Sequence, residues 1–147
     1  MTLVIGFGNP LRQDDSVGWA VAEALADQPG VELRRVHQLL PELAEPLSRA
    51  KDVVFVDARR GVPAGEVRRT RLTPASSTWS GAHSLSPEAL LGLCERYYGR
   101  TPEAALVSIG GARFGFGEDL SPEVRDAIPQ AVSCVLGGRG PLPVKER

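Results

Sequence analysis

The stretch that decides the fold is LVIGFGNPLRQDDSVGWAVAEALA, residues 3–26. It opens with a short apolar run ending at glycine, which suits a strand buried on both faces. Behind the loop, apolar residues recur at helical spacing and predict a helix over 15–26, with Asp14 or Asp15 available as its N-cap. A strand, a loop and a helix in this order are the building unit of α/β proteins.

The rest of the chain repeats this alternation of strands and helices. Further strands are predicted over 31–36, 52–58, 67–72 and 105–110. Helices are predicted from Pro41, with Pro46 limiting the regularity of the first, and behind the start signals Ser86-Pro87-Glu88 and Ser121-Pro122-Glu123. The strand over 67–72 alternates polar and apolar residues and suits a half-exposed edge feature. Together these elements predict an α/β domain with a doubly wound, mostly parallel sheet of about five strands and helices on both faces.

Bulk properties restrict the class of protein. A length of 147 residues predicts a single domain over 1–147, with 137–147 as a flexible Gly/Pro-rich tail. The net charge is −1, so neither nucleic acid nor an anionic membrane is an expected partner. No apolar run is long enough to span a bilayer and no signal peptide opens the chain, which predicts a cytoplasmic protein. We expect a monomer, with Cys94 and Cys134 used for packing.

The loop GFGNPL, residues 6–11, invites a nucleotide-binding hypothesis. It offers G-x-G behind a first strand, but Leu11 stands where a third glycine would complete the dinucleotide fingerprint. A pyrophosphate would also sit at the start of the next helix, where Asp14 and Asp15 would repel it. No acidic residue that could hold a ribose ends the second strand. The sequence therefore argues against a nucleotide site.

Three potential ligands fall at the carboxyl edge of the predicted sheet, where α/β proteins bind their ligands. Asp15 follows the first strand, Asp57 ends VVFVD, and His83 lies in the long polar loop 73–85. Two carboxylates and an imidazole suit a divalent transition metal such as zinc or nickel. Other interpretations stay open at this stage: Asp15 as a simple helix cap, His83 as a surface histidine, and an aspartate pair acting as a hydrolytic dyad.

Four segments, in order along the chain, resemble the hydrogenase maturation proteases, the endopeptidases that trim nickel–iron hydrogenase precursors. They are GFGNPLRQDDSVG, VVFVDA, AHSLSPEALL and LSPEV, and the resemblance extends to about residue 136. It implies a three-layer αβα architecture, phosphorylase/hydrolase-like, around a twisted, mostly parallel five-stranded sheet. It also implies removal of a C-terminal extension from a hydrogenase large-subunit precursor after nickel insertion. A non-catalytic chaperone of the same fold that binds nickel or the precursor is the alternative.

The family's metal-contacting and catalytic trio falls on Asp15, Asp57 and His83. The resemblance implies that this trio meets nickel already held by the substrate, although the site can be expected to bind nickel, zinc or cadmium in vitro. No organic cofactor is implied. Whether metal-activated water or an aspartate acting as base performs the hydrolysis stays open at this stage.

Asn9, His37 and Gln38 are the residues expected to face the substrate. The segment that begins with the last two reads HQLLPELAEPL and departs from the glycine-rich turn common in the family, a departure that bears on which hydrogenase is served. A second departure is Ser16, which stands where a glycine usually follows the acid pair.

Overall fold

The computed structural model describes residues 1–75 and 85–137 of the chain. In order, its elements are β1 (Thr2–Phe7), the 3-10 turn η1 (Gln13–Ser16), α1 (Val17–Ala24), β2 (Val31–Val36), the 3-10 turn η2 (Pro41–Leu43), α2 (Ala44–Arg49), β3 (Asp52–Arg59), β4 (Val67–Leu72), α3 (Pro87–Tyr98), β5 (Glu103–Gly110) and α4 (Pro122–Val135). All five predicted strands and all four predicted helices are present within this part of the chain.

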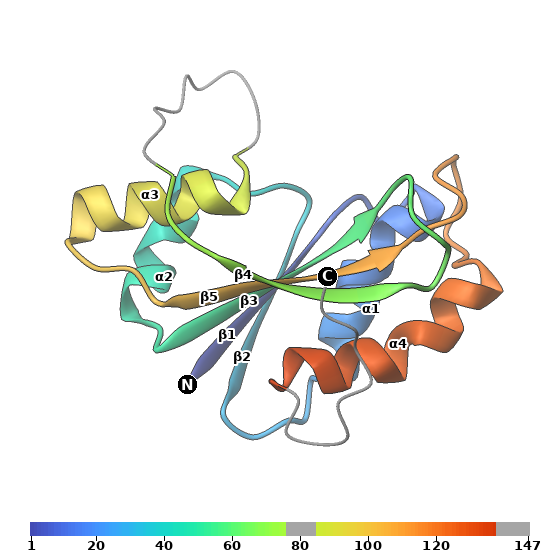
Figure 1. The fold of residues 1–147 in the computed structure, drawn as a ribbon, viewed down its shortest axis with the longest axis horizontal. Coiled ribbons are helices and arrows are strands. Elements are labelled where there is room, and N and C mark those ends of the chain that lie inside the picture. Colours follow the sequence, from blue (N-terminus) through green and yellow to red (C-terminus); the bar gives the residue numbers. More distant parts are fainter. Residues whose placement is uncertain (76–84, 138–147) are drawn as a thin grey trace.

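The strands form one twisted sheet with the order β2-β1-β3-β5-β4 (Figure 1). Neighbouring strands are parallel except at one edge, where β4 runs antiparallel to β5. The prediction of a half-exposed edge strand over 67–72 is therefore confirmed. Because β1, β2, β3 and β5 all run the same way, their carboxyl ends meet at a single edge of the sheet, where the candidate site lies.

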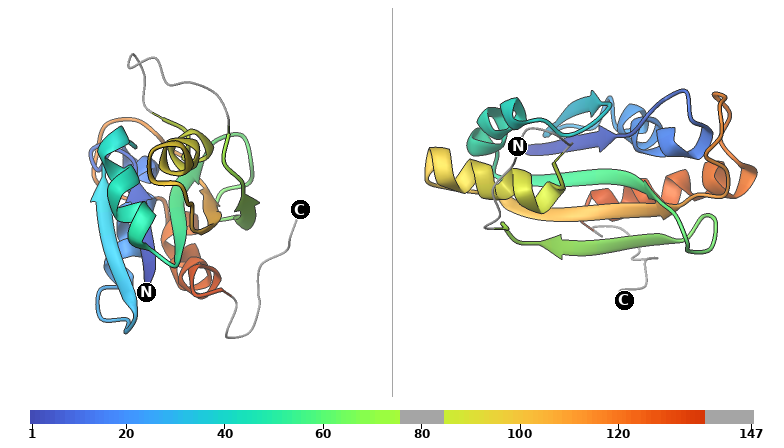
Figure 2. Two further views of the ribbon diagram at one scale, coloured as in Figure 1. Left: turned by 90° about the vertical axis from the view of Figure 1, so that its left-hand side faces the viewer. Right: turned by 90° about the horizontal axis from the view of Figure 1, so that it is seen from above.

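Helices cover both faces of the sheet, which makes the three-layer αβα architecture implied by the sequence. Helices α1 and α4 pack on one face and α2 and α3 on the other (Figure 2). Each side has its own apolar core: Val17 and Val124 belong to the first, and Leu47 and Leu90 to the second. Burial of apolar side chains on both faces explains why β1 and β3 consist mainly of buried apolar residues, whereas in the edge strand β4 only Val67 and Leu72 are buried.

The start signals of the later helices behave as the sequence predicts. Ser86 caps α3, and its side chain accepts a hydrogen bond from the Ala89 N–H at 3.1 Å. Pro41 opens η2 and Pro122 opens α4 at the first helical positions. Helix α3 ends at Gly99, whose φ of 75° is the left-handed conformation typical of a helix C-terminus.

The predicted cap of the first helix is wrong. The N-cap of α1 is Ser16, which makes no side-chain capping bond, and neither Asp14 nor Asp15 fills that place. The predicted helix over 15–26 is instead a 3-10 turn over Gln13–Ser16 followed by α1. The reason is that both carboxylates are bonded elsewhere, as described below.

The described residues contain no helix long and apolar enough to cross a membrane. Cys94 and Cys134 are both buried and form no disulfide within the described residues, which agrees with the packing role expected for them. Two predictions fall on residues outside the described ranges: the ligand His83, and the tail beyond Gly137.

Candidate functional site at the carboxyl edge of the sheet

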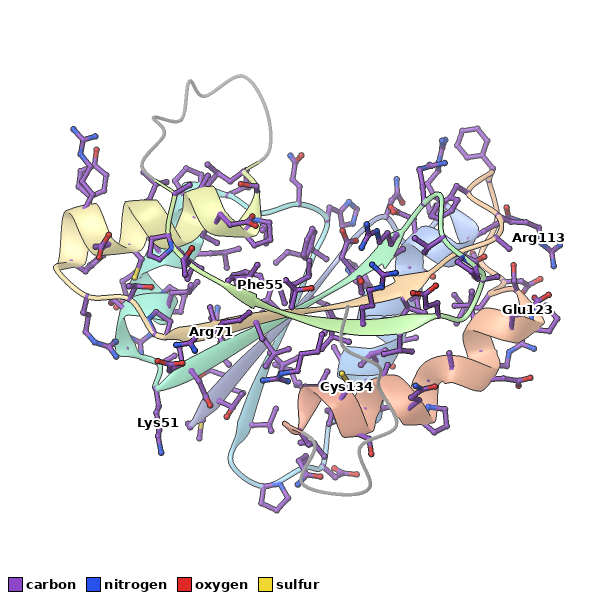
Figure 3. The ribbon with its side chains drawn as sticks, in the orientation of Figure 1. Lys51, Phe55, Arg71, Arg113, Glu123 and Cys134 are labelled. Atoms are coloured by element: carbon purple, nitrogen blue, oxygen red, sulfur yellow. The ribbon has the colours of Figure 1, made fainter. Side chains whose placement is uncertain are left out.

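The candidate site lies beyond the carboxyl ends of the parallel strands. Figure 3 orients it: Arg113, in the loop that follows β5, and Glu123, in the first turn of α4, mark this end of the molecule. Lys51, which precedes β3, and Arg71 in β4 mark the opposite end. Three loops meet at the carboxyl edge: the one between β1 and α1, the one that follows β3, and the one between β5 and α4.

Two glycines bring the first of these loops close to the sheet. Gly8 has a φ of +146°, and a Cβ placed on it would lie 2.0 Å from the backbone oxygen of Asp15. Gly18 approaches the sheet equally closely, since a Cβ there would lie 2.4 Å from the carbonyl oxygen of Val56 in β3. Any side chain at either position would displace the loop. The glycines therefore hold Asp15 against the ends of β1 and β3.

Asp57 directly follows the buried apolar run of β3, two residues before the strand ends at Arg59. One of its oxygens, Oδ1, accepts a hydrogen bond from the Ala58 N–H at 2.8 Å. Burial raises the pKa of Asp57 to about 7; the bond from Ala58 opposes this, and the negative charge of Asp15 adds to it. The fold has thus brought Asp15 and Asp57 within electrostatic reach of each other, as the sequence analysis predicted.

Asp15 is held in place by the loop that carries it. Its Oδ2 accepts a hydrogen bond from the backbone N–H of Asn9 at 2.7 Å. The Asn9 side chain accepts in turn from the Leu11 N–H at 2.9 Å, which closes a local turn. Within the described part of the chain, Oδ1 of Asp15 and Oδ2 of Asp57 have no hydrogen-bond partner, so each acid keeps one oxygen available.

Asp14, next to Asp15, has a different role that the sequence did not reveal. It is fully buried and accepts four hydrogen bonds from the loop between β5 and α4. The donors are the N–H groups of Ala112, Arg113 and Ser121 and the hydroxyl of Ser121, at 2.7 to 2.9 Å. Burial by itself would raise the pKa of Asp14, but these bonds outweigh it and leave the pKa below its ordinary value. Asp14 therefore ties two of the three loops together.

His37 and Gln38 lie at the same edge, directly behind β2, and both are exposed. The His37 ring packs against Trp19 of α1, with ring centroids 5.4 Å apart. The Trp19 Nε1–H donates to the carbonyl oxygen of Val36 at 2.9 Å, which fixes the indole beneath the imidazole. An exposed position on the neighbouring strand end suits a substrate-facing side chain, which stays a prediction for both residues.

Asp15 and Asp57 present an acidic pair whose chemistry suits a cation. Partly desolvated carboxylates that repel each other are stabilised by a divalent ion between them, and each has one oxygen to offer. Among residues 1–75 and 85–137, no group of three or more His, Cys, Asp and Glu side chains is arranged to hold a metal ion. The predicted third ligand, His83, lies outside these residues. The acid pair can therefore supply two oxygen ligands.

Comparison with solved structures identifies the class of fold. The chain is similar to the NiFe hydrogenase maturation protease HybD from Thermococcus kodakarensis, with a TM-score of 0.74 and 21% identity over 95% of this chain and 99% of that one. It is similar to the hydrogenase maturating endopeptidase HybD from E. coli, with a TM-score of 0.70 and 23% identity over 93% and 90% of the two chains. A hydrogenase 2 maturation peptidase from a Thaumarchaeota archaeon gives a TM-score of 0.70 and 24% identity over 95% and 97%.

No protein-family model and no curated protein sequence matches the chain. The similarity thus lies in the fold, and it extends over nearly the whole of each chain. The protein has the fold of the hydrogenase maturation proteases, and the architecture implied by the resemblance is confirmed.

Proposed function

We propose that this chain is a hydrogenase maturation protease, an endopeptidase that removes the C-terminal extension of a nickel–iron hydrogenase large-subunit precursor after nickel insertion. The observation that carries the proposal is the juxtaposition of Asp15 and Asp57 at the carboxyl edge of the sheet, with the pKa of Asp57 raised to about 7. The shared fold and the four ordered sequence segments support it.

Each residue of the trio has a place in this proposal. The free oxygens of Asp15 and Asp57, together with the imidazole of His83, would contact nickel carried by the precursor, so that only a loaded precursor aligns its scissile bond. A carboxyl group with a pKa of about 7 exchanges a proton readily at neutral pH. Asp57 would therefore take the proton of the attacking water, through the carboxylate oxygen that does not face the nickel. Asn9, His37 and Gln38 would face the peptide on either side.

The proposal is tested by incubating the purified protein with a nickel-loaded large-subunit precursor and measuring loss of the C-terminal extension by mass spectrometry. We expect Asp57→Asn and His83→Ala to reduce processing by at least about 100-fold, because removal of a catalytic acid–base group costs about that much. Asp52→Asn is the matched control: it is the same change on the same strand, but Asp52 begins β3 at the opposite edge. It should process at the wild-type rate.

Three outcomes decide between the proposal and its alternative. Normal processing by both site variants would show that the site is misassigned. A stable complex of the wild-type protein with an uncut precursor would favour the non-catalytic chaperone. A precursor without nickel should stay uncut, and cleavage of that precursor at the same rate would overturn the role of nickel in recognition. The monomeric state and the cytoplasmic location stay sequence-based predictions.

A further inference from the structure

A ridge of arginine and aromatic side chains stands beside the acid pair. Phe116, between β5 and α4, is 83% exposed, and Leu11, between β1 and α1, is 56% exposed. The Arg12 guanidinium lies over the Phe116 ring, 4.7 Å from its centroid. We call the Leu11, Arg12 and Phe116 side chains the docking ridge. A large apolar ring that stands almost wholly in water, with an arginine stacked on it, offers the kind of anchor that dominates protein interfaces.

The backbone beneath the docking ridge is held by hydrogen bonds between its two loops. Phe116 lies between Gly115 and Gly117, and the Gly117 N–H donates to the Leu11 carbonyl oxygen at 2.9 Å. The Gln13 N–H donates to the Gly117 carbonyl oxygen at 2.9 Å, and the Gln13 side chain accepts from the Gly115 N–H at 2.9 Å. Gln13 itself has a left-handed φ of 51°, which costs energy in a residue with a side chain and which these bonds maintain. Loops joined by such bonds have less conformational entropy to lose when a partner covers them.

The two loops that form the ridge protrude side by side past the end of the sheet (Figure 2). One carries Asp15, so the ridge and the acid pair belong to a single continuous edge. Arg12 precedes Asp15 by three residues in that loop, so a partner that contacts the acid pair can contact the ridge as well. The exposed Phe116 ring can therefore contact the same partner as the acid pair.

Charge around the ridge shows what kind of partner fits. Four arginines lie at this edge: Arg12, Arg59, Arg60 and Arg113. None of them forms an ion pair in the ranges 1–75 and 85–137. Arg60 stacks on Phe114, 3.9 Å from its ring centroid, which repeats the arrangement of Arg12 and Phe116. Exposed Glu118 and Asp119 are the acidic residues of the same loop. Arginines that form no ion pair within the described ranges therefore flank the acid pair on both loops of the ridge, with exposed Glu118, Asp119 and Glu123 at the same edge.

We propose that the docking ridge binds the folded surface of the substrate precursor, at a carboxylate-bearing patch with an apolar recess that receives Phe116. This inference rests on the proposed function, since it takes the precursor as the partner. Complementarity assigns the chemistry: a cation at the centre of the partner faces Asp15 and Asp57, and carboxylates around that cation face the arginines. The acid pair then contacts the scissile segment, whereas the docking ridge supplies affinity for the intact precursor.

The other end of the molecule offers an internal control. Tyr97, near the end of α3, is 67% exposed, and the Arg96 guanidinium lies 5.6 Å from the centroid of its ring. This pair has the same chemistry as Arg12 and Phe116, but it lies where α3 leads into β5, at the amino edge of the sheet. If the docking ridge acts because it stands beside the acid pair, substitution of Phe116 must weaken precursor binding and substitution of Tyr97 must leave it unchanged.

The experiment measures binding and cleavage separately. Intact nickel-loaded precursor is immobilised, and interferometry compares its binding to wild type, Phe116→Ser, Arg12→Glu, Tyr97→Ser and Arg96→Glu. KM and kcat for processing are then measured for each protein. We expect Phe116→Ser and Arg12→Glu to weaken precursor binding by about tenfold or more, as hot-spot residues do, with the loss appearing chiefly in KM. The Tyr97 and Arg96 variants should bind and process like wild type. Arg12→Glu should also reduce the salt dependence of the association rate.

The possible outcomes separate the ridge from the proposed function. Unchanged binding by Phe116→Ser and Arg12→Glu, with processing intact, would overturn the ridge and leave the peptidase standing. Binding by wild type without cleavage, lost in both ridge variants, would support the ridge and overturn the peptidase. An equal loss at Tyr97 would overturn the assignment to this edge, and a wild-type protein that neither binds nor cleaves overturns both. Arg12→Glu keeps the test valid if Phe116→Ser proves unstable.

Discussion

Asp14 and Asp57 lie at the same edge of the same sheet and have opposite environments. Asp14 is fully buried, yet four hydrogen bonds stabilise its charge and lower its pKa. Asp57 is only partly buried, but it accepts one hydrogen bond, faces the charge of Asp15, and has a pKa of about 7. Burial raises the pKa of both carboxyl groups; it dominates at Asp57, whereas four hydrogen bonds outweigh it at Asp14. The balance between desolvation and hydrogen-bond donors therefore decides which acid stabilises the fold and which is left reactive.

This contrast gives the two regions different tasks. The junction at Asp14 uses its hydrogen bonds to join the first loop to the start of α4, so its acid has no remaining capacity for a ligand. The region around Asp57 leaves the acid under-satisfied, which costs stability but keeps an oxygen and a proton available. Functional sites commonly carry such a cost. Substitutions at Asp14, Asp57 and Ser121 can test this division.

The largest effect should come from Asp14→Ala. Removing the carboxylate leaves the N–H groups of Ala112, Arg113 and Ser121 without their acceptor in the interior. We expect the free energy of unfolding to fall by about 3–5 kcal/mol, the usual cost of breaking a buried charged network. Urea denaturation of the two proteins at pH 7 measures the difference. A loss below about 1 kcal/mol would show that Asp14 is not the main tie between the loops.

Asp57→Asn should raise the free energy of unfolding at pH 8, whereas Asp14→Ala lowers it. The pKa of Asp57 is about 7 in the folded protein against an ordinary value of 3.8, so the folded state holds the proton more tightly. The protonated Asp57 carboxyl therefore contributes fully to stability below pH 3.8, and this contribution is lost as the pH rises through 7. Asparagine does not ionise, so the variant should be more stable than wild type by about 2–4 kcal/mol at pH 8.

The control for Asp57→Asn is the same comparison in acid. Below pH 3.8 both proteins are uncharged at this position, and the advantage of the variant should vanish. Thermal unfolding at both pH values gives the two differences. An advantage of equal size at both would contradict the electrostatic origin and point to improved packing instead.

The pH dependence of Asp14 should run the other way. Its pKa in the folded protein lies below the ordinary value of 3.8, so its contribution is present above pH 3.8 and is lost as pH falls through the folded pKa. The stability difference between wild type and Asp14→Asn should therefore shrink as the solution is acidified from pH 6. A difference that stays constant down to the acid transition would show that Asp14 is not ionised in the folded state.

Ser121→Ala should have the smallest effect. It removes the hydroxyl that donates to Asp14 at 2.7 Å but leaves the three backbone donors in place. We expect a loss of about 1–2 kcal/mol, a typical value for one hydrogen bond to a charged group. Ser86→Ala, which removes the capping bond of α3 at the other face of the sheet, is the matched control and should cost about 1 kcal/mol without changing the pH dependence.

Most of the architecture could be read from the sequence because it depends on local periodicity. The buried run VVFV in β3 and the Ser-Pro-Glu signals ahead of α3 and α4 each report an environment that the chain itself encodes. The placement of Asp15 and Asp57 at one edge followed from the parallel order of their strands. The prediction of an N-cap failed because a carboxylate can be bonded by partners far along the chain, which no local pattern reveals.

Local sequence patterns therefore suffice for the α/β alternation, for the half-exposed strand over 67–72, and for the end of the sheet at which the acid pair lies. Which of the two adjacent aspartates is structural depends on contacts that form only in the folded chain. The hydrogen-bond donors to Asp14 lie 98 to 107 residues further along the chain. Asp15, in the turn after β1, meets Asp57 of the neighbouring strand β3. The tertiary structure likewise placed Phe116 on Arg12. Hydrogen bonding depends on distance in space, so neighbours that look equivalent in the sequence acquire different partners and different tasks once the loops meet.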